Sequence, residues 1–199
     1  VWLPMPSQLP YGYASTAEHT AGVCQMEYPT IRERVVRSDE FLALKGIVEN
    51  PDFRVSGDVE RYFEALTKYI WDHKMFGAIY DLYRASTVIH GENGHVTEGV
   101  PAILQHTSDR VFSIPDLTTN FIEIFAEKID GNRFRFVQVT YLEATFTGPC
   151  RYGGPGRQSM NYDNNMSICE CLLQKIDGTW TITEEWCLGF DDFFKRLFY

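Results

Sequence analysis

The second half of the chain contains four long runs rich in β-branched and aromatic residues, and this feature limits the fold more than any other. The runs span residues 117–129, 134–147, 166–176 and 180–188. Asp130-Gly131 and Asp177-Gly178 separate neighbouring runs, and Asp-Gly is a typical dipeptide of tight β-hairpin turns. We therefore predict an antiparallel meander. Because strands of this length twist, we expect the sheet to curve.

Helical periodicity precedes this strand-rich half. Apolar residues recur at helical spacing over residues 59–70. Further helices are predicted over residues 75–83 and 100–111, with a short strand, residues 87–90, between them. Helices followed by hairpin-linked strands are typical of an α+β domain in which the helices pack on one face of the sheet. The face that the helices cover should then be concave.

The first 55 residues are predicted to form an N-terminal arm. Proline, glycine and serine interrupt roughly the first 28 residues, which show no sustained period. One or two short helices are expected between Thr30 and Asn50, where a capping-box spacing precedes a broken apolar stripe. We assign residues 56–199 to the α+β domain.

The charge balance argues against two classes of partner. The chain has 18 Lys and Arg against 27 Asp and Glu, a net charge of −9, which opposes binding to nucleic acid or to an anionic membrane. No apolar run approaches the roughly 20 residues that span a bilayer. The five cysteines lack the spacing of a zinc site, and the histidines form no spaced cluster with carboxylates. We therefore expect a cytoplasmic protein without a metal ion.

Four short motifs occur in an order that resembles a known family. They are YIWDHKMFGAIYDLYRASTVIHG over residues 69–91, Ile-Pro-Asp-Leu over residues 114–117, Ala-Thr-Phe-Thr-Gly over residues 144–148, and Asp177-Gly178 followed by Glu185-Trp186 and Asp191. Together they resemble the SnoaL-like polyketide cyclases of the nuclear-transport-factor-2-like superfamily, over roughly residues 59–194. The resemblance implies a cystatin-like α+β roll, in which a curved antiparallel sheet wraps N-terminal helices around a cone-shaped apolar pocket. It specifies an activity less closely, because this scaffold hosts cyclases, isomerases, dehydratases and non-catalytic binding domains.

The resemblance also implies a catalytic pair. The polyketide cyclases of this family close a ring by an intramolecular aldol reaction, with an Asp as general base, a nearby His, and neither metal nor cofactor. The closing Asp corresponds to Asp191, five residues after Trp186 where four is the commoner spacing. The family's strand His falls on Phe146, which cannot transfer a proton. His90, at the end of the short strand, is therefore the predicted acid–base partner of Asp191.

Each of these polar candidates also has a structural interpretation. Asp191 could instead cap a terminal helix over the segment DDFFKRLFY, and Asp192 is the alternative base if the local register differs by one residue. His90 could be a hydrogen-bonded structural histidine. Asp116 could contact substrate or cap the turn that follows Pro115.

The predicted pocket wall follows from strand parity and aromatic spacing. Even positions of the run 134–147 are apolar or small and should face the helices, whereas Glu184 and Glu185 must point to opposite faces of their strand. At most one of these two carboxylates can reach the pocket. The predicted substrate-binding residues are Trp71, Tyr83, Asp116, Leu142, Phe146 and Trp186. For the aromatic residues, plain core packing is the alternative.

Two functional hypotheses follow. The first is an enzyme, without a cofactor, that cyclises, isomerises or dehydrates a small, largely apolar carbonyl compound. The second is a binding or interaction module of the same fold without chemistry. A homodimer is also predicted. The strand residues that alternate with the inward-facing ones include apolar side chains, which form a stripe on the face of the sheet that the helices leave uncovered. The stripe is expected to contain Val137, Val139, Tyr141, Cys169, Cys171 and Leu173. The alternative is that the N-terminal arm covers this face.

Overall fold

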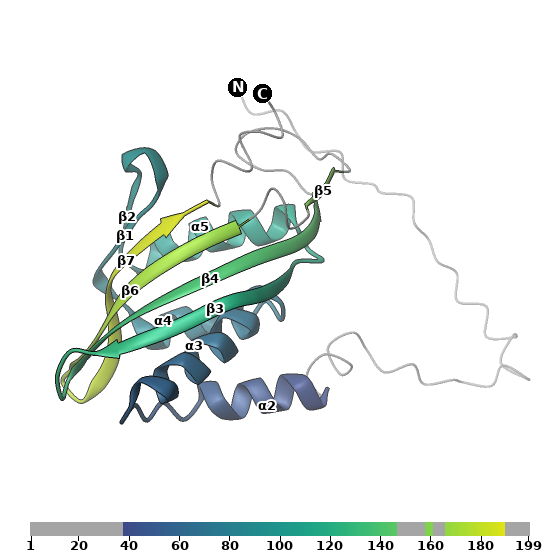
Figure 1. Cartoon of the computed structure of the whole chain (residues 1–199). Helices are drawn as coiled ribbons and strands as arrows, with labels where there is room; N and C mark the ends of the chain where they lie inside the picture. Colours follow the sequence, from purple (N-terminus) through teal and green to yellow (C-terminus); the bar gives the residue numbers. More distant parts are fainter. Residues whose placement is uncertain (1–37, 147–157, 161–165, 190–199) are drawn as a thin grey trace, which may run out of the picture.

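The computed structural model describes residues 38–146, 158–160 and 166–189 of the chain, and it shows a curved sheet with the described helices on one side (Figure 1). The helices are α2 (Asp39–Val48), α3 (Ser56–Trp71), α4 (Ile79–Leu82) and α5 (Val100–Ser113), with 3-10 turns at Phe76–Ala78 and Glu92–Gly94. The strands are β1 (Tyr83–His90), β2 (Val96–Glu98), β3 (Thr118–Lys128), β4 (Arg133–Phe146), β5 (Gln158–Met160), β6 (Met166–Ile176) and β7 (Thr179–Leu188). The predicted α+β class is confirmed.

The long strands form the predicted meander. The strand order is β2-β1-β7-β6-β4-β3, and β5 pairs with β4. At the β6–β7 turn both Asp177 and Gly178 have positive φ angles, 50° and 82°, which is the turn geometry whose twist matches that of the flanking strands. β3, β4, β6 and β7 pair antiparallel in turn.

One pairing differs from the prediction of an antiparallel sheet. Strand β1 runs parallel to β7, with His90 opposite Trp186, so the sheet is mixed. No hairpin joins these two strands, because α5 and the whole meander lie between them in the chain. Their relative direction is therefore set by how the helical half packs on the sheet, which turn dipeptides do not encode.

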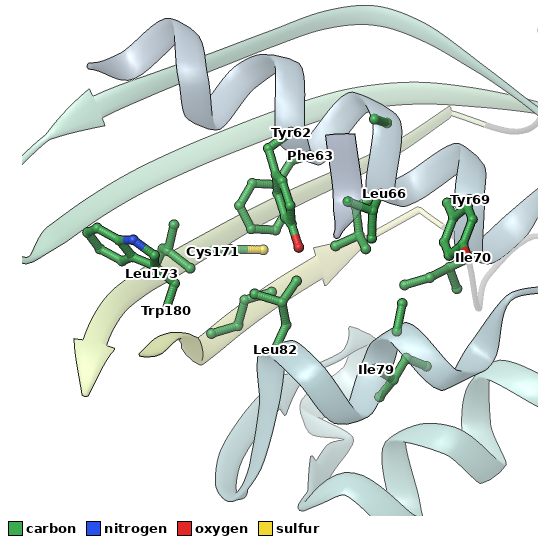
Figure 2. Packing of buried hydrophobic residues seen from close by; sticks show 14 of the residues in the cluster. Tyr62, Phe63, Leu66, Tyr69, Ile70, Ile79, Leu82, Cys171, Leu173 and Trp180 are labelled. Atoms are coloured by element: carbon green, nitrogen blue, oxygen red, sulfur yellow. The ribbon is translucent and has the colours of Figure 1, made fainter. Parts of the chain in front are cut away.

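Helix α3 joins the helical half to the sheet. Its predicted apolar stripe is buried, and Phe63 stacks on Phe136 of β4 with ring centroids 3.8 Å apart. At its start the Asp58 carboxylate accepts hydrogen bonds from the backbone N–H groups of Arg54 and Val55, at 2.9 and 3.1 Å. These bonds lower the pKa of Asp58. Figure 2 shows the α3 side chains in the core that they share with Cys171 of β6.

Helix α2 adds to the same core. Ser38 caps the helix, since its hydroxyl oxygen accepts a 3.1 Å hydrogen bond from the backbone N–H of Phe41. Phe41 is 2% exposed and stacks on Tyr69 of α3, with ring centroids 5.4 Å apart. A short helix therefore lies within the range expected for the N-terminal arm, and it packs against α3.

The sequence pattern predicted correctly which residues of β4 face the helices, but it assigned the residues of β6 to the wrong face of the sheet. Phe134 and Phe136 of β4 are buried against the helices. Cys171 and Leu173 of β6, which were expected to face outward, are 2% and 1% exposed and belong to the core. The reason is cross-strand register: Cys171 pairs with Phe136 and Leu173 with Phe134, and directly paired residues share a face.

The outer face of the sheet, which the described helices leave uncovered, is nevertheless apolar. We use the name outer face for a set of exposed or half-buried apolar residues that are cross-strand partners or lie two positions apart on one strand. They are Phe125, Val137, Val139, Ile168 and Leu188. Ile168 is 41% exposed and lies between Val139 and Leu188 in the pairing register. The exposed apolar stripe is thus real, but β6 contributes different residues from those predicted.

Candidate functional site

A cavity of about 120 Å³ lies between the inner face of the sheet and helices α3 and α5. The α3 side is mostly apolar, with Leu66, Ile70 and Trp71 in the wall. Polar side chains also line the cavity, among them Cys169, Glu185 and Arg110 from β6, β7 and α5, and Thr67 and Gln138 from α3 and β4. A mostly apolar cavity with a few convergent polar groups is the usual form of a small-molecule site.

Besides Glu92, whose carboxylate accepts a hydrogen bond from the backbone N–H of Gly189, this wall contains the carboxylate of Glu185 of β7. The side chain is half-buried, and it lines the cavity beside Ile89, its partner residue on β1. Burial raises the pKa of Glu185, although hydrogen bonds from Cys187 and Tyr83 and the charge of Arg110 act in the opposite direction. The carboxylate is therefore a stronger base than an exposed glutamate.

Both carboxylate oxygens of Glu185 accept hydrogen bonds. The Tyr83 hydroxyl donates to Oε2 at 2.8 Å, and the Cys187 thiol donates to Oε1 at 2.9 Å. Burial, followed by the charge of Glu185, raises the pKa of Tyr83 well above its usual value, so the phenol stays protonated as a donor. These two bonds hold the carboxylate in one orientation in the cavity wall.

Helix α5 supplies basic side chains to the same cavity. His106 and Arg110 are one helical turn apart and both line it. The Arg110 charge lowers the pKa of Glu185, so the guanidinium is near enough to act on groups in the cavity. The site therefore combines a raised-pKa carboxylate, a neutral phenol donor and a cation.

Two thiols complete this polar cluster. Cys169 and Cys187 lie directly opposite each other on β6 and β7, with their sulfur atoms 2.9 Å apart. Together with the Glu185 carboxylate they are a group of potential metal-ligating atoms within 4.8 Å of one another. In the structure these atoms are already joined to one another by the thiol–thiol and thiol–carboxylate contacts.

Three of the predicted substrate-binding residues line the cavity, namely Trp71, Tyr83 and Leu142. Phe146 is 1% exposed at the end of β4 and is not in the cavity wall. Asp116 is exposed, and its carboxylate accepts a 2.8 Å hydrogen bond from the backbone N–H of Thr145. That bond joins Asp116 to the end of β4, 29 residues further along the chain, so it is a structural contact but not the local turn cap considered from the sequence.

His90 and Trp186 lie on the outer face of the sheet, away from the cavity. Their rings stack with centroids 5.2 Å apart and an interplanar angle of 13°, and His90 Nε2 is 2.9 Å from Glu184 Oε1. Neither residue lines the cavity. Asp191 and Asp192 fall outside the described residues. The structure therefore does not bring His90 into a pocket site, and it describes no contact between His90 and Asp191.

No sequence pattern predicted a role in the site for Arg110, His106, Cys187 or the Cys169–Cys187 contact. The one useful signal was the Glu184-Glu185 pair, which required one of the two carboxylates to face inward. Helical spacing from Ile103 also places His106 and Arg110 near one helix face, but polar residues there are ordinarily assigned to solvent.

No protein-family model matches this sequence, and no curated protein matches it significantly. Within the described residues, no helix is long and apolar enough to cross a membrane. Solved structures do match the fold. LinA has 10% identity and a TM-score of 0.52, over 74% of this chain and 86% of LinA. Aln2 from a Streptomyces species has 16% identity and a TM-score of 0.50, over 70% of this chain and 94% of Aln2.

A protein from a Jannaschia species, described as a SnoaL-like polyketide cyclase, has 12% identity and a TM-score of 0.48, over 69% of this chain and 90% of its own. Identities this low compare folds and carry no activity from one protein to another. The helix-covered curved sheet and the matches to LinA and Aln2 agree with the family motifs in the sequence. The chain therefore shares the α+β fold of LinA and Aln2.

Proposed function

We propose that the chain binds a small, largely apolar carbonyl compound in the cavity and catalyses proton transfer without a cofactor, with Glu185 as the general base. The observation that carries this proposal is the Glu185 carboxylate in the cavity wall, with a raised pKa and a fixed orientation. A base works best when its pKa lies near the working pH, and burial moves a carboxylate in that direction.

The proposed reaction begins with removal of a proton from the carbon next to the carbonyl group. Glu185 accepts the proton, and the electron pair moves to the carbonyl oxygen to form an enolate. The guanidinium of Arg110 stabilises the negative charge in a mostly apolar cavity. Return of the proton from Glu185 to another carbon gives isomerisation. Loss of a β-hydroxyl, which leaves as water with the proton from Glu185, gives dehydration. Attack of the enolate carbon on a second carbonyl, whose oxygen takes that proton, gives cyclisation.

Cavity size supports a small ligand. A volume of about 120 Å³ is close to that of protein cavities that hold one benzene ring. Leu66, Ile70 and Trp71 offer an apolar surface to the ligand body, while Glu185 and Arg110 add charged groups to the wall. We therefore propose a compound about the size of one six-membered ring.

The adjacent carboxylates provide a matched test. We would measure deuterium incorporation from D2O into cyclohexanone and 2-cyclohexenone by NMR, and binding of both by thermal shift. Glu185→Gln should slow exchange by about 100-fold or more, whereas Glu184→Gln, on the outer face, should leave it unchanged. Equal exchange in both variants would exclude Glu185 as the base.

The second candidate function is binding without chemistry. A thermal shift that survives Glu185→Gln, together with exchange at the solvent rate in the unmodified protein, would favour this function over catalysis. The predicted catalytic role of Asp191 stays a proposal, because that residue lies outside the described part of the chain.

The outer face supports a further part of this proposal, a homodimer. Phe125, Ile168 and Leu188 are 49%, 41% and 59% exposed, and they lie on strands whose other face is covered by helices. Two copies related by a two-fold axis could bury this surface against itself.

A further inference from the structure

We propose that Cys169 and Cys187 are a redox-active thiol pair in the cavity wall, which forms a reversible intramolecular disulfide with a small disulfide such as oxidised glutathione. This inference concerns the thiols themselves. Its effect on Glu185, given below, rests on the proposed function.

Sheet pairing holds the two thiols in position. Cys169 and Cys187 are direct partners across the antiparallel β6–β7 pair, so their side chains leave the same face of the sheet side by side. Their sulfur atoms are 2.9 Å apart, and a disulfide bond needs about 2.05 Å. The two sulfur atoms are therefore already in contact.

Access distinguishes this pair from the neighbouring Cys171. Cys169 and Cys187 are half-buried, so both residues keep part of their surface exposed. Cys171 is 2% exposed in the hydrophobic core.

The reaction is an ordinary thiol–disulfide exchange in two steps. One cysteine, as thiolate, attacks oxidised glutathione, forms a mixed disulfide and releases one glutathione thiol. The second cysteine then attacks the mixed disulfide and releases the other. The protein loses two thiol hydrogens and two electrons, and one glutathione disulfide becomes two glutathione thiols.

The experiment should measure how much disulfide is present at equilibrium, rather than how fast the disulfide forms. The neighbouring Cys169 thiol, followed by burial, raises the pKa of Cys187 well above its usual value, so thiolate is scarce and exchange is slow. The second step is favoured, because the other thiol is already in contact and behaves as if at very high concentration.

Disulfide formation would also change the proposed base. The Cys187 thiol donates the 2.9 Å hydrogen bond to Oε1 of Glu185, and this bond lowers the pKa of that carboxyl. Oxidation removes the thiol hydrogen, so the carboxylate loses a donor. We therefore expect the oxidised protein to differ from the reduced protein in any activity that depends on Glu185.

The test uses the full chain, reduced, freed of reductant and equilibrated with oxidised glutathione. After alkylation under denaturing conditions, the number of free thiols should fall from five to three. Trypsin cleaves at Lys175, between the two cysteines, so mapping without reductant should show one linked pair of peptides. Five remaining thiols, or a persistent glutathione adduct, would refute the proposal.

Matched alanine variants identify the partner. One peptide contains both Cys169 and Cys171, so mapping alone does not separate them. The cross-link should persist in Cys171→Ala and disappear in Cys169→Ala. The reverse result would overturn the assignment. This experiment uses no substrate, so it can succeed or fail independently of the proposed catalysis.

Discussion

The Tyr83 hydroxyl donates a 2.8 Å hydrogen bond to Oε2 of Glu185, from a residue 102 positions earlier in the chain. This bond opposes the effect of burial on the pKa of Glu185. Tyr83→Phe should therefore raise the pKa of Glu185 further and move the acidic limb of the pH–rate profile to higher pH. An unshifted profile with a uniformly lower rate would mean that Tyr83 acts only through packing.

Burial of Glu185 also predicts how stability depends on pH. The raised pKa means that the folded protein binds the proton more tightly than the unfolded chain does. The free energy of unfolding should therefore lose a contribution as pH rises from the ordinary glutamate pKa through the raised value. Asp72, whose pKa burial also raises, contributes in the same direction.

The substitution Glu185→Gln measures how much Glu185 contributes to the pH dependence of the free energy of unfolding. Relative to the unmodified protein, the variant should gain stability as pH rises through this window, as measured by urea unfolding at several pH values. Glu184→Gln, on the outer face, is the control. If both variants show the same pH dependence, Glu185 does not titrate with a raised pKa.

The Phe63–Phe136 stack should be a main support of the core. Phe136 is 1% exposed and its ring lies 3.8 Å from that of Phe63, so Phe136→Ala should cost about 3–5 kcal/mol of unfolding free energy. Phe112 is 67% exposed, and Phe112→Ala should change stability by about 0.5 kcal/mol or less. Similar losses in the two variants would contradict this assignment of the core.

Charge placed on the outer face should separate the proposed dimer. Ile168→Lys puts an ammonium group in the middle of the apolar surface, and light scattering should then give a monomer mass. Leu42→Lys, at a 51% exposed site on α2, is a matched control that should leave the mass unchanged. If the full-length protein is a monomer and dimerises only after removal of residues 1–37, the N-terminal arm and not a second copy covers this face.

The class of fold could be predicted from the sequence because its signals are local. The period of the apolar residues from Val59 to Ile70 predicts a helix face, and that stripe is buried in the structure. Asp177-Gly178 predicts a tight hairpin, and both residues have the positive φ angles that this turn needs. Such features depend on residues a few positions apart.

The site depended on register between distant strands, which no local pattern encodes. Simple alternation from the buried Ile182 would point Glu184 inward, but the β6–β7 pairing shifts between Leu172 and Leu173, and one extra residue of β7 enters there. Glu185 consequently faces the cavity, and Glu184 bonds to His90 on the outer face. The sequence determined that one of these carboxylates must face inward. Only the tertiary structure decided which one, because a one-residue shift in a strand exchanges its two faces.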